Sequence, residues 1–350
     1  MENGKKARNQ YFDLLNVSAC FSVVVLHSTG QVFNYSPSGT WTVALLLQTL
    51  CHFSVPVFFM LSGATLLEYR KRYTTREYFR KRWQRIGIPF IFWTLFYILW
   101  NQLVLHGTPL KGPLNLLNIF MNNGASNIFW FFYALLPIYL LFPLLSLVDW
   151  QNRRRVLFYL LCVCFIYNQI MPVLSRFFDL SVTSFADFPF KNNYVDYALL
   201  GLFLRDMELT KRRKLFIFLI GAVGFAGMAG GTWYLSSSAG KTDAFFMDYH
   251  SVFCYFLAIF AFIFARILCD CHVFKKTIEN KKIGSFLPTL AGASFGVYLT
   301  HLLVMTGLSY ILKFPHPVLS MTVGALVIYT ITVSLTVLAK KTPVLKAVFP

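Results

Sequence analysis

Long apolar runs separated by short basic segments follow one another along this chain. About 20 apolar residues suffice for a helix to cross a hydrocarbon core about 30 Å thick. Runs of about that length or longer occupy residues 11–33, 41–67, 86–106, 127–148, 156–174, 215–235, 250–268, 286–311 and 317–339. One shorter run occupies 194–204. The pattern predicts an all-α polytopic membrane protein with about ten transmembrane helices in one bundle. No soluble segment interrupts the runs, so we expect a single transmembrane domain over 1–350.

The shortest run, 194–204, differs from the others because it carries Asp196. An ionisable group inside a membrane is costly unless it faces a partner or a wet interior. We therefore expect a short or tilted helix that packs inside the bundle rather than facing lipid.

Composition supports a membrane protein: 57% of the residues are hydrophobic and 13% are charged, with a mean hydropathy of +0.57. The net charge of +18 would also suit a nucleic-acid-binding protein, so the location of the charges decides. When the loops alternate across ten spans, 27 of the 32 Lys and Arg residues fall on one side. The positive-inside rule then predicts a multi-pass protein of the cell membrane with both termini cytoplasmic and no nucleic-acid partner. The first run is broken by polar residues and has no small-x-small cleavage site after it, so we expect it to remain as an anchor.

The first run carries Asp13, Asn16 and His27 among apolar residues. At 1.5 Å per residue, His27 lies roughly 24 Å along the helix from its start and so in the exterior half of the membrane. His301, in a helix that also enters from the cytoplasm, reaches a similar level, and His52, in a helix that runs the other way, falls near the middle. The three imidazoles are expected to converge on one internal cavity. The alternative for each is a buried histidine that is hydrogen-bonded to a neighbouring helix.

Eight basic residues occupy the cytoplasmic segment 70–85. Arg82 and Arg85 are three apart on an expected helix, so they would project from one face and hold a pyrophosphate or a 3′-phosphate. The alternative is a cluster that lies on anionic lipid headgroups.

One stretch inside a span and the longer exterior loops have two possible roles each. Pro56 and the Ser62-Gly63 pair lie inside a span, where they would bend the helix or let another backbone or a slim ligand approach. The longer exterior loops, 107–126, 175–193 and 236–249, carry Asn, Ser, Gly and Asp, which suits a polar acceptor site or an ordinary solvated loop.

Several classes of chemistry lack a motif in this chain. Cys269, Cys271 and His272 make only half of a metal-ligand pattern, so we expect no metal. No Walker-type or dinucleotide-binding glycine motif is present, which disfavours ATP-driven transport by this chain alone and a bound nucleotide cofactor. None of the seven cysteines falls in an exterior loop, so no disulfide framework is expected.

Five short motifs, in this order, resemble the integral-membrane acyltransferase-3 family. They are Arg8 with Asp13 and His27-Ser28, SVPVFFMLSG at 54–63, Arg82-x-x-Arg85-Ile-x-x-Pro89, WFFYALLPIYLLFPLL at 130–145 and SFGVYLTH at 294–301. Asn16 departs from the pattern, because the family usually has a second arginine there.

The resemblance implies an O-acyltransferase that moves an acyl group, expected to be acetyl, from cytoplasmic acetyl-CoA to a hydroxyl of a cell-surface or lipid-linked glycan. No permanently bound cofactor is expected. His27 would be the general base. The donor would be held by Arg82, Arg85 and Asn16, and the substrate or cavity-lining residues would be Asp13, Ser62, His52, Ser294, Tyr298 and His301.

Two other functions stay open at this point. The first is an exporter of polysaccharide or lipid-linked sugar, in which the intramembrane His and Asp residues would serve proton coupling. Transporters often show two similar halves, and this chain has no such internal symmetry. The second is a scaffold or sensor without catalysis, which only Asn16 favours.

Overall fold

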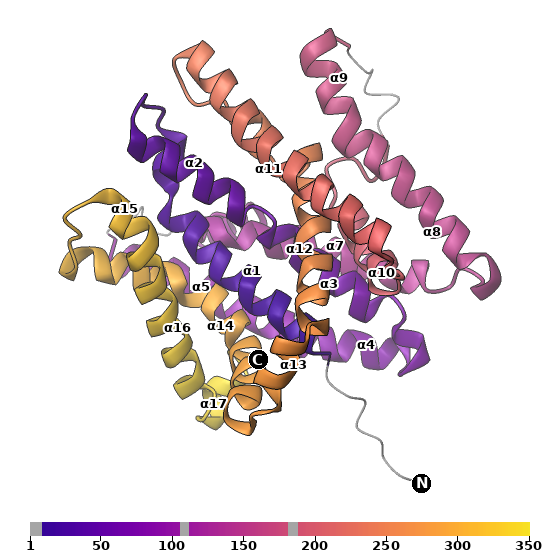
Figure 1. The fold of residues 1–350 in the computed structure, drawn as a ribbon. Coiled ribbons are helices and arrows are strands. Elements are labelled where there is room, and N and C mark those ends of the chain that lie inside the picture. The colour runs from indigo at the N-terminus through magenta and orange to yellow at the C-terminus, as the bar shows by residue number, and fades with distance from the viewer. Residues whose placement is uncertain (1–8, 106–111, 181–187) are drawn as a thin grey trace. The chain divides into compact units, whose positions relative to one another are not determined.

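The computed structural model describes residues 9–105, 112–180 and 188–350 (Figure 1). Within these ranges the regular structure is helical and contains no strand. Nine helical stretches of the described chain are long and apolar enough to cross a membrane: Gln10–Ser28, Gly39–Lys71, Thr75–Leu103, Asn127–Leu145, Gln151–Phe178, Lys211–Ala239, Phe245–Asp270, Gly284–Ile311 and Pro317–Ala339. The prediction of an all-α polytopic membrane protein is therefore confirmed. The cytoplasmic location of both termini stays a prediction.

The chain divides into two compact units, which are described separately. Unit 1 comprises Met1–Ala64 and Tyr159–Val333, and unit 2 comprises Thr65–Phe158 and Ser334–Pro350. Whether these units act as the single domain that we expect from the sequence stays a prediction.

Unit 1 contains most of the helices. Its α-helices are α1 (Gln10–Ser28), α2 (Gly39–Cys51), α9 (Met171–Phe178), α10 (Val195–Arg205), α11 (Lys211–Ala239), α12 (Val252–Asp270), α13 (His272–Glu279), α14 (Lys281–Ile311) and α15 (Pro317–Leu319). Its shorter turns are η1 (Gly30–Phe33), η5 (Ile166–Ile170), η7 (Phe245–Met247) and η8 (Ser320–Gly324). Three helices cross the boundary between the units: α3 (Ser54–Leu66), α8 (Trp150–Phe165) and α16 (Ala325–Ala339).

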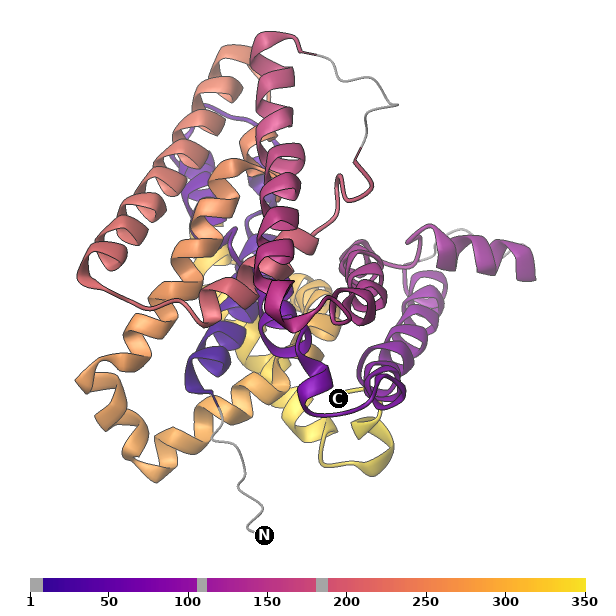
Figure 2. The same ribbon diagram turned by 90° about the vertical axis from the view of Figure 1, so that its right-hand side faces the viewer.

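Helix α1 is the central element of unit 1. It contacts α14, α12 and α2, and α11 lies along α12 (Figure 1 and Figure 2). The side chains at the α1–α14 contact are small or β-branched, among them Cys20, Val24 and Val297, all at most 2% exposed. Small side chains let helix axes approach closely in a membrane, so polar groups on α1 and α14 come within reach of one another.

The apolar run 41–67 lies within one candidate span, Gly39–Lys71, whose helix is interrupted after Cys51 so that α2 and α3 follow one another. Pro56 causes the break, since it has no N–H to donate to the carbonyl of residue 52. The His52 carbonyl instead lies 3.7 Å from the Sγ of Cys254 on α12.

Helix α10 corresponds to the shortest apolar run and is buried over most of its length. Its 11 residues extend about 16 Å, so α10 is not among the nine stretches long enough to cross a membrane, and its place as a tenth span stays a prediction. Gly201 of α10 faces the backbone of Met60, and Gly63 of α3 faces the backbone of Ala198, so that a Cβ at either glycine would overlap main-chain atoms. The expectation of a short helix packed inside the protein is confirmed, and Gly63 serves the approach of another backbone.

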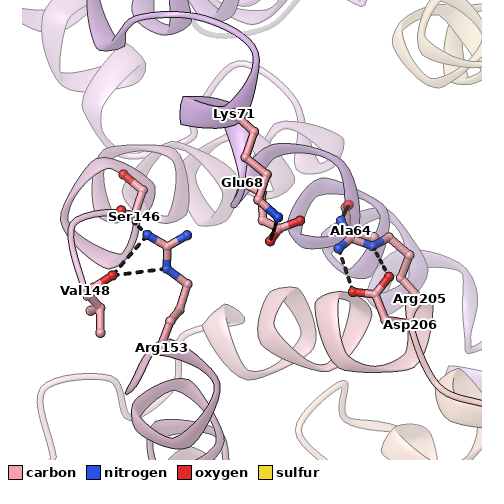
Figure 3. A network of polar contacts seen from close by, with 8 residues as sticks. All are labelled: Ala64, Glu68, Lys71, Ser146, Val148, Arg153, Arg205 and Asp206. Atoms are coloured by element: carbon pink, nitrogen blue, oxygen red, sulfur yellow. Dashed lines mark hydrogen bonds and ion pairs between the residues drawn. The ribbon is translucent and has the colours of Figure 1, made fainter. Parts of the chain in front are cut away.

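Charge-assisted hydrogen bonds hold the C-terminal end of α10 in place (Figure 3). The Arg205 guanidinium donates to the Ala64 carbonyl at 2.7 Å and pairs with Asp206 through two bonds of 2.8 and 2.7 Å. These contacts tie the C-terminal end of α10 to α3 within unit 1.

The longest helical stretch within unit 2 is Thr75–Leu103. The elements of this unit are η2 (Tyr69–Lys71), α4 (Thr75–Arg82), η3 (Trp83–Gly87), α5 (Ile88–Leu103), α6 (Pro113–Met121), η4 (Asn127–Phe129), α7 (Trp130–Leu145) and α17 (Pro343–Lys346). An aromatic core joins α5 to α7, with the rings of Phe90 and Phe132 4.8 Å apart. The Arg153 guanidinium closes the turn after α7 by donating to the carbonyls of Ser146 and Val148 (Figure 3).

Candidate functional site

Two histidines from distant parts of the sequence lie together in unit 1. His27 is in the last turn of α1, and His301 is in α14. Their ring centroids are 5.0 Å apart and the ring planes are inclined by 48°. The His27 side chain is exposed, whereas His301 is completely buried. The pair therefore presents one accessible imidazole backed by a second that is held in the protein interior.

The hydrogen bonds of His301 determine which of its ring nitrogens carries the proton. Its Nδ1 lies 2.8 Å from the carbonyl oxygen of Tyr298 and 3.1 Å from that of Val297. Because carbonyl oxygens only accept, Nδ1 must be the donor, and in the neutral ring Nε2 then has a free lone pair. The Nε2 atom is buried and has no hydrogen-bond partner among the described residues. It is thus an acceptor available to a group beside it.

The end of α1 that carries His27 is held by polar side chains. Gln48 of α2 donates its Nε2 to the Leu26 carbonyl at 2.8 Å, and the Thr29 hydroxyl donates to the Val25 carbonyl at 2.8 Å. The carbonyls of the last helical turn, which a helix end often leaves with few partners, thus accept side-chain donors here. They also fix the backbone on both sides of His27.

His52 does not join the histidine pair. It caps α2 and is 5% exposed, and its ring stacks on Tyr249 with centroids 4.7 Å apart. Among the ring contacts of the described residues, His27 meets His301 and His52 meets Tyr249. The expectation that three imidazoles converge is therefore correct for two of them, because the helix break at Pro56 directs His52 toward α12.

Further down the α1–α14 contact, the other predicted site residues make structural hydrogen bonds. The Asn16 amide donates to the Ala291 carbonyl at 3.2 Å. The Ser294 hydroxyl donates to the Leu290 carbonyl at 3.2 Å, so it would have to leave this bond to donate to a substrate. Tyr298 is half-buried with its ring centroid 6.4 Å from that of His301.

Asp13 and Ser62 lie away from the histidine pair. Asp13 is 8% exposed in the first turn of α1, where a carboxylate is stabilised by the helix dipole. It precedes His27 by about 21 Å of helix, so it does not contact the imidazole. Ser62 is half-buried beside Gly63 on α3. Arg8, the first residue of the family pattern, lies outside the described residues.

Arg82 in unit 2 is oriented by aromatic rings. Its guanidinium carbon is 5.7 Å from the ring centroid of Tyr139 and 5.9 Å from that of Tyr78, within the range of cation–π attraction. The Tyr78 hydroxyl donates to the Tyr139 carbonyl at 3.0 Å, which joins α4 to α7. Arg82 is thus a half-buried cation in a defined position.

Arg85 lies in the π-helical turn η3 and is exposed. That it shares one face with Arg82 stays a prediction; α4 ends at Arg82, and Arg85 lies in the wider turn that follows. Such single π-turns occur frequently at functional sites. Of the two arginines expected to bind the donor, Arg82 is held by tyrosine rings and Arg85 is exposed.

Lys340 and Lys346 are two cations near Arg85 that sequence reasoning missed. Burial lowers the pKa of Lys340 from its ordinary value of 10.5, and the positive charges of Arg85 and Lys346 lower it further. Lys340 donates to the Pro350 carbonyl at 2.9 Å. Three cations from both ends of unit 2 therefore share one electrostatic environment, which an anion would stabilise. In the sequence, the positive charge after the last apolar run is the one signal that could have suggested a role for Lys340 and Lys346.

The described residues contain no group of three His, Cys, Asp or Glu side chains that could hold a metal ion. Cys269 is buried at the end of α12, while Cys271 and His272 are exposed.

The fold and the intramembrane histidines define a multi-pass membrane protein with a polar interior. A family model described as an acyltransferase domain matches residues 9–339, which is nearly the whole chain and both units. The chain therefore belongs to the acyltransferase-3 family and is a membrane acyltransferase, whose substrates are an acyl donor and an acceptor. Searches of curated proteins and of solved structures found no match.

Proposed function

We propose that this protein transfers an acyl group, acetyl, from cytoplasmic acetyl-CoA to a hydroxyl of a cell-surface or lipid-linked glycan at the cell membrane. The observation that carries the proposal is the His27–His301 pair, because it supplies an accessible imidazole with a buried acceptor behind it. Family membership supplies the class of reaction.

His27 acts as the general base in this proposal. One ring nitrogen removes the proton of the acceptor hydroxyl while its oxygen attacks the thioester carbonyl. The carbon–sulfur bond then breaks, and the imidazolium returns the proton to the CoA thiolate. The products are an ester and CoA, and the imidazole is neutral again.

His301 positions His27. During the reaction, the second nitrogen of His27 turns to donate its proton to Nε2 of His301, which makes no hydrogen bond with the described residues in this structure, so the first nitrogen keeps its lone pair for the hydroxyl. The same contact stabilises the positive charge that His27 acquires during the reaction. This is the role that a carboxylate has in other acyl-transfer sites.

The donor phosphates bind to the basic residues of unit 2. Arg82 offers a guanidinium held against Tyr78 and Tyr139, and Arg85 offers an exposed one. Guanidinium groups suit phosphate oxygens because they donate two parallel hydrogen bonds. The neighbouring Lys340 and Lys346 add positive charge.

The remaining predicted residues have supporting roles. Asn16 binds the donor through its amide oxygen, since its amide nitrogen is bonded to Ala291. Asp13 stabilises the start of α1. The substrate path is lined by Ser62, His52, Ser294 and Tyr298.

The experiment that tests the proposal uses radiolabelled acetyl-CoA and membranes that contain the protein. Label should appear in glycan or lipid-linked material, and His27→Ala should abolish it at equal protein level. An exporter would move glycan without incorporating label, and a scaffold would do neither. Absence of label from the wild-type reaction, with native glycan lipids present, would refute acyl transfer to glycans.

A further inference from the structure

A second group of polar side chains is buried in unit 1 around the start of α10. Asp196 is completely buried. One of its carboxylate oxygens accepts from the Gln169 amide at 2.8 Å and the other accepts from the Tyr197 backbone N–H at 2.9 Å. Asp196 also lies in the first turn of α10, where the helix dipole favours a negative charge. These contacts hold the carboxylate in place.

The segment before α12 completes this group. The Tyr197 hydroxyl donates to the Tyr249 carbonyl at 2.6 Å, and the rings of Tyr194 and His250 are 4.5 Å apart. The Asp248 carboxylate accepts from the His250 backbone N–H at 2.7 Å and lies 3.6 Å from the His250 Nδ1. The start of α10 is therefore next to residues 248–250, where the predicted exterior loop 236–249 meets the next predicted span.

Two polar atoms of this group have no partner. The Oε1 of Gln169 and the Nε2 of His250 are buried and make no hydrogen bond with the described residues. Gln169 is completely buried in the π-helical turn η5. Buried polar atoms in proteins are nearly always hydrogen-bonded, so such orphaned atoms call for an explanation. Gln169 Oε1 only accepts, and Asp196 only accepts when ionised.

The chemistry of the group selects hydroxyls. Hydroxyl groups donate to carboxylate and amide oxygens and exchange hydrogen bonds with imidazole in either direction. A buried carboxylate disfavours an anionic ligand. Tyr194, which is stacked on Phe59 at 4.6 Å, adds flat apolar surface of the kind that small-molecule sites combine with a few polar groups.

We propose that Asp196, Gln169 and His250 form a binding site for the hydroxyls of a neutral sugar. The proposal rests on the proposed function, because this sugar is the acceptor glycan or its lipid-linked precursor. The site is separate from the base. Tyr249 stacks on His52, which lies four residues after Gln48 on α2, and Gln48 is bonded to the Leu26 carbonyl beside His27. The sugar site and the histidine pair both lie in unit 1, and both are next to the C-terminal part of α2.

The test measures sugar binding by the full chain in detergent micelles, by saturation-transfer NMR with glucose, galactose, rhamnose and N-acetylglucosamine as probes. At least one probe should bind to the wild type. Asp196→Asn, which keeps the side-chain shape, and His250→Phe, which keeps the ring against Tyr194, should each weaken binding by about tenfold or more, as expected for the loss of a hydrogen bond to a buried polar group. Asp179→Asn makes the same chemical change at an exposed carboxylate and should leave binding unchanged.

The outcomes separate this site from the proposed reaction. His27→Ala should retain sugar binding although it abolishes transfer. Binding without transfer in the wild type would refute the reaction and keep the site, whereas transfer without binding by any probe would refute the site. The site would also be refuted if Asp196→Asn and His250→Phe, folded by their melting curves, bind as the wild type does. A melting temperature that rises with sodium ions through Asp196, with no sugar bound, would show a cation site instead.

Discussion

The ring centroids of His27, in the last turn of α1, and His301, in α14, are 5.0 Å apart. The Nδ1 of His301 is hydrogen-bonded to backbone carbonyls of its own helix. This relationship assigns different roles to the two rings. In the proposed reaction, the exposed ring of His27 meets the substrate and the buried ring of His301 acts through His27.

His27→Ala removes the proposed general base. Acyl transfer should fall by about 10²–10⁴-fold, the usual contribution of a positioned base. The measurement is label transferred from acetyl-CoA by protein in membranes, with binding of CoA as the second readout, which should not change. His272→Ala is the matched control, because His272 is an exposed histidine at the start of α13. Full activity of His27→Ala would refute its role.

His301→Ala tests the positioning role. The turnover number should fall by about 10- to 100-fold while KM for acetyl-CoA is unchanged, because His301 does not touch the donor. The double variant with His27→Ala should be no slower than His27→Ala alone, since residues that act as a unit are not additive. Two independent, multiplying losses would show instead that His301 does not act through His27.

Arg85→Ala tests the donor site. KM for acetyl-CoA should rise by about tenfold or more, since a charged hydrogen bond to phosphate contributes about 1.5–3 kcal/mol. The acceptor KM should not change. Arg76→Ala removes another exposed arginine of the same segment and serves as the control. If acetyl-CoA and its analogue without the 3′-phosphate lose equal affinity in Arg85→Ala, then Arg85 contacts the pyrophosphate rather than the 3′-phosphate.

Lys340 predicts a pH dependence of CoA binding. Because its pKa in the folded protein lies below 10.5, the ammonium loses its proton on the alkaline side earlier than an ordinary lysine does. Affinity for CoA should therefore fall as the pH rises through that lowered pKa. Lys340→Arg should remove the fall, because a guanidinium stays charged at these pH values. Titration calorimetry at a series of alkaline pH values measures the CoA affinity of the wild type and of Lys340→Arg. If the two proteins show the same dependence of affinity on pH, Lys340 is not part of the donor site.

Gly63→Ala and Gly201→Ala test the packing of α3 against α10. A methyl group at either position overlaps main-chain atoms that cannot rotate away, so each change should cost about 1–3 kcal/mol of stability. The melting temperature in detergent is the measurement. Gly307→Ala in α14 is the control, because nothing lies within 4 Å of the added Cβ. Unchanged melting of Gly63→Ala would show that the two helices do not pack so closely.

Local sequence patterns predicted the helices well, but they predicted the contacts between helices poorly. Helices begin and end near the apolar runs because length and hydropathy are properties of consecutive residues. The expectation that His27 and His301 lie at a similar depth followed from the rise per residue along each helix. That Arg85 lies in a π-turn, and that Lys340 shares its environment, depends on contacts between residues far apart in the sequence.

The amino-acid sequence by itself determined that the protein is a helical membrane protein, which segments are helices, and which residues are costly enough in lipid to mark a site. It also determined the family, through short motifs in a fixed order. Only the tertiary structure decided that His27 meets His301 while His52 turns to Tyr249, and that Gln169 is the partner of Asp196. The physical reason is that helical rise gives the depth of a residue, whereas the azimuth of a helix and its neighbours are set by packing among small residues such as Gly63 and Gly201.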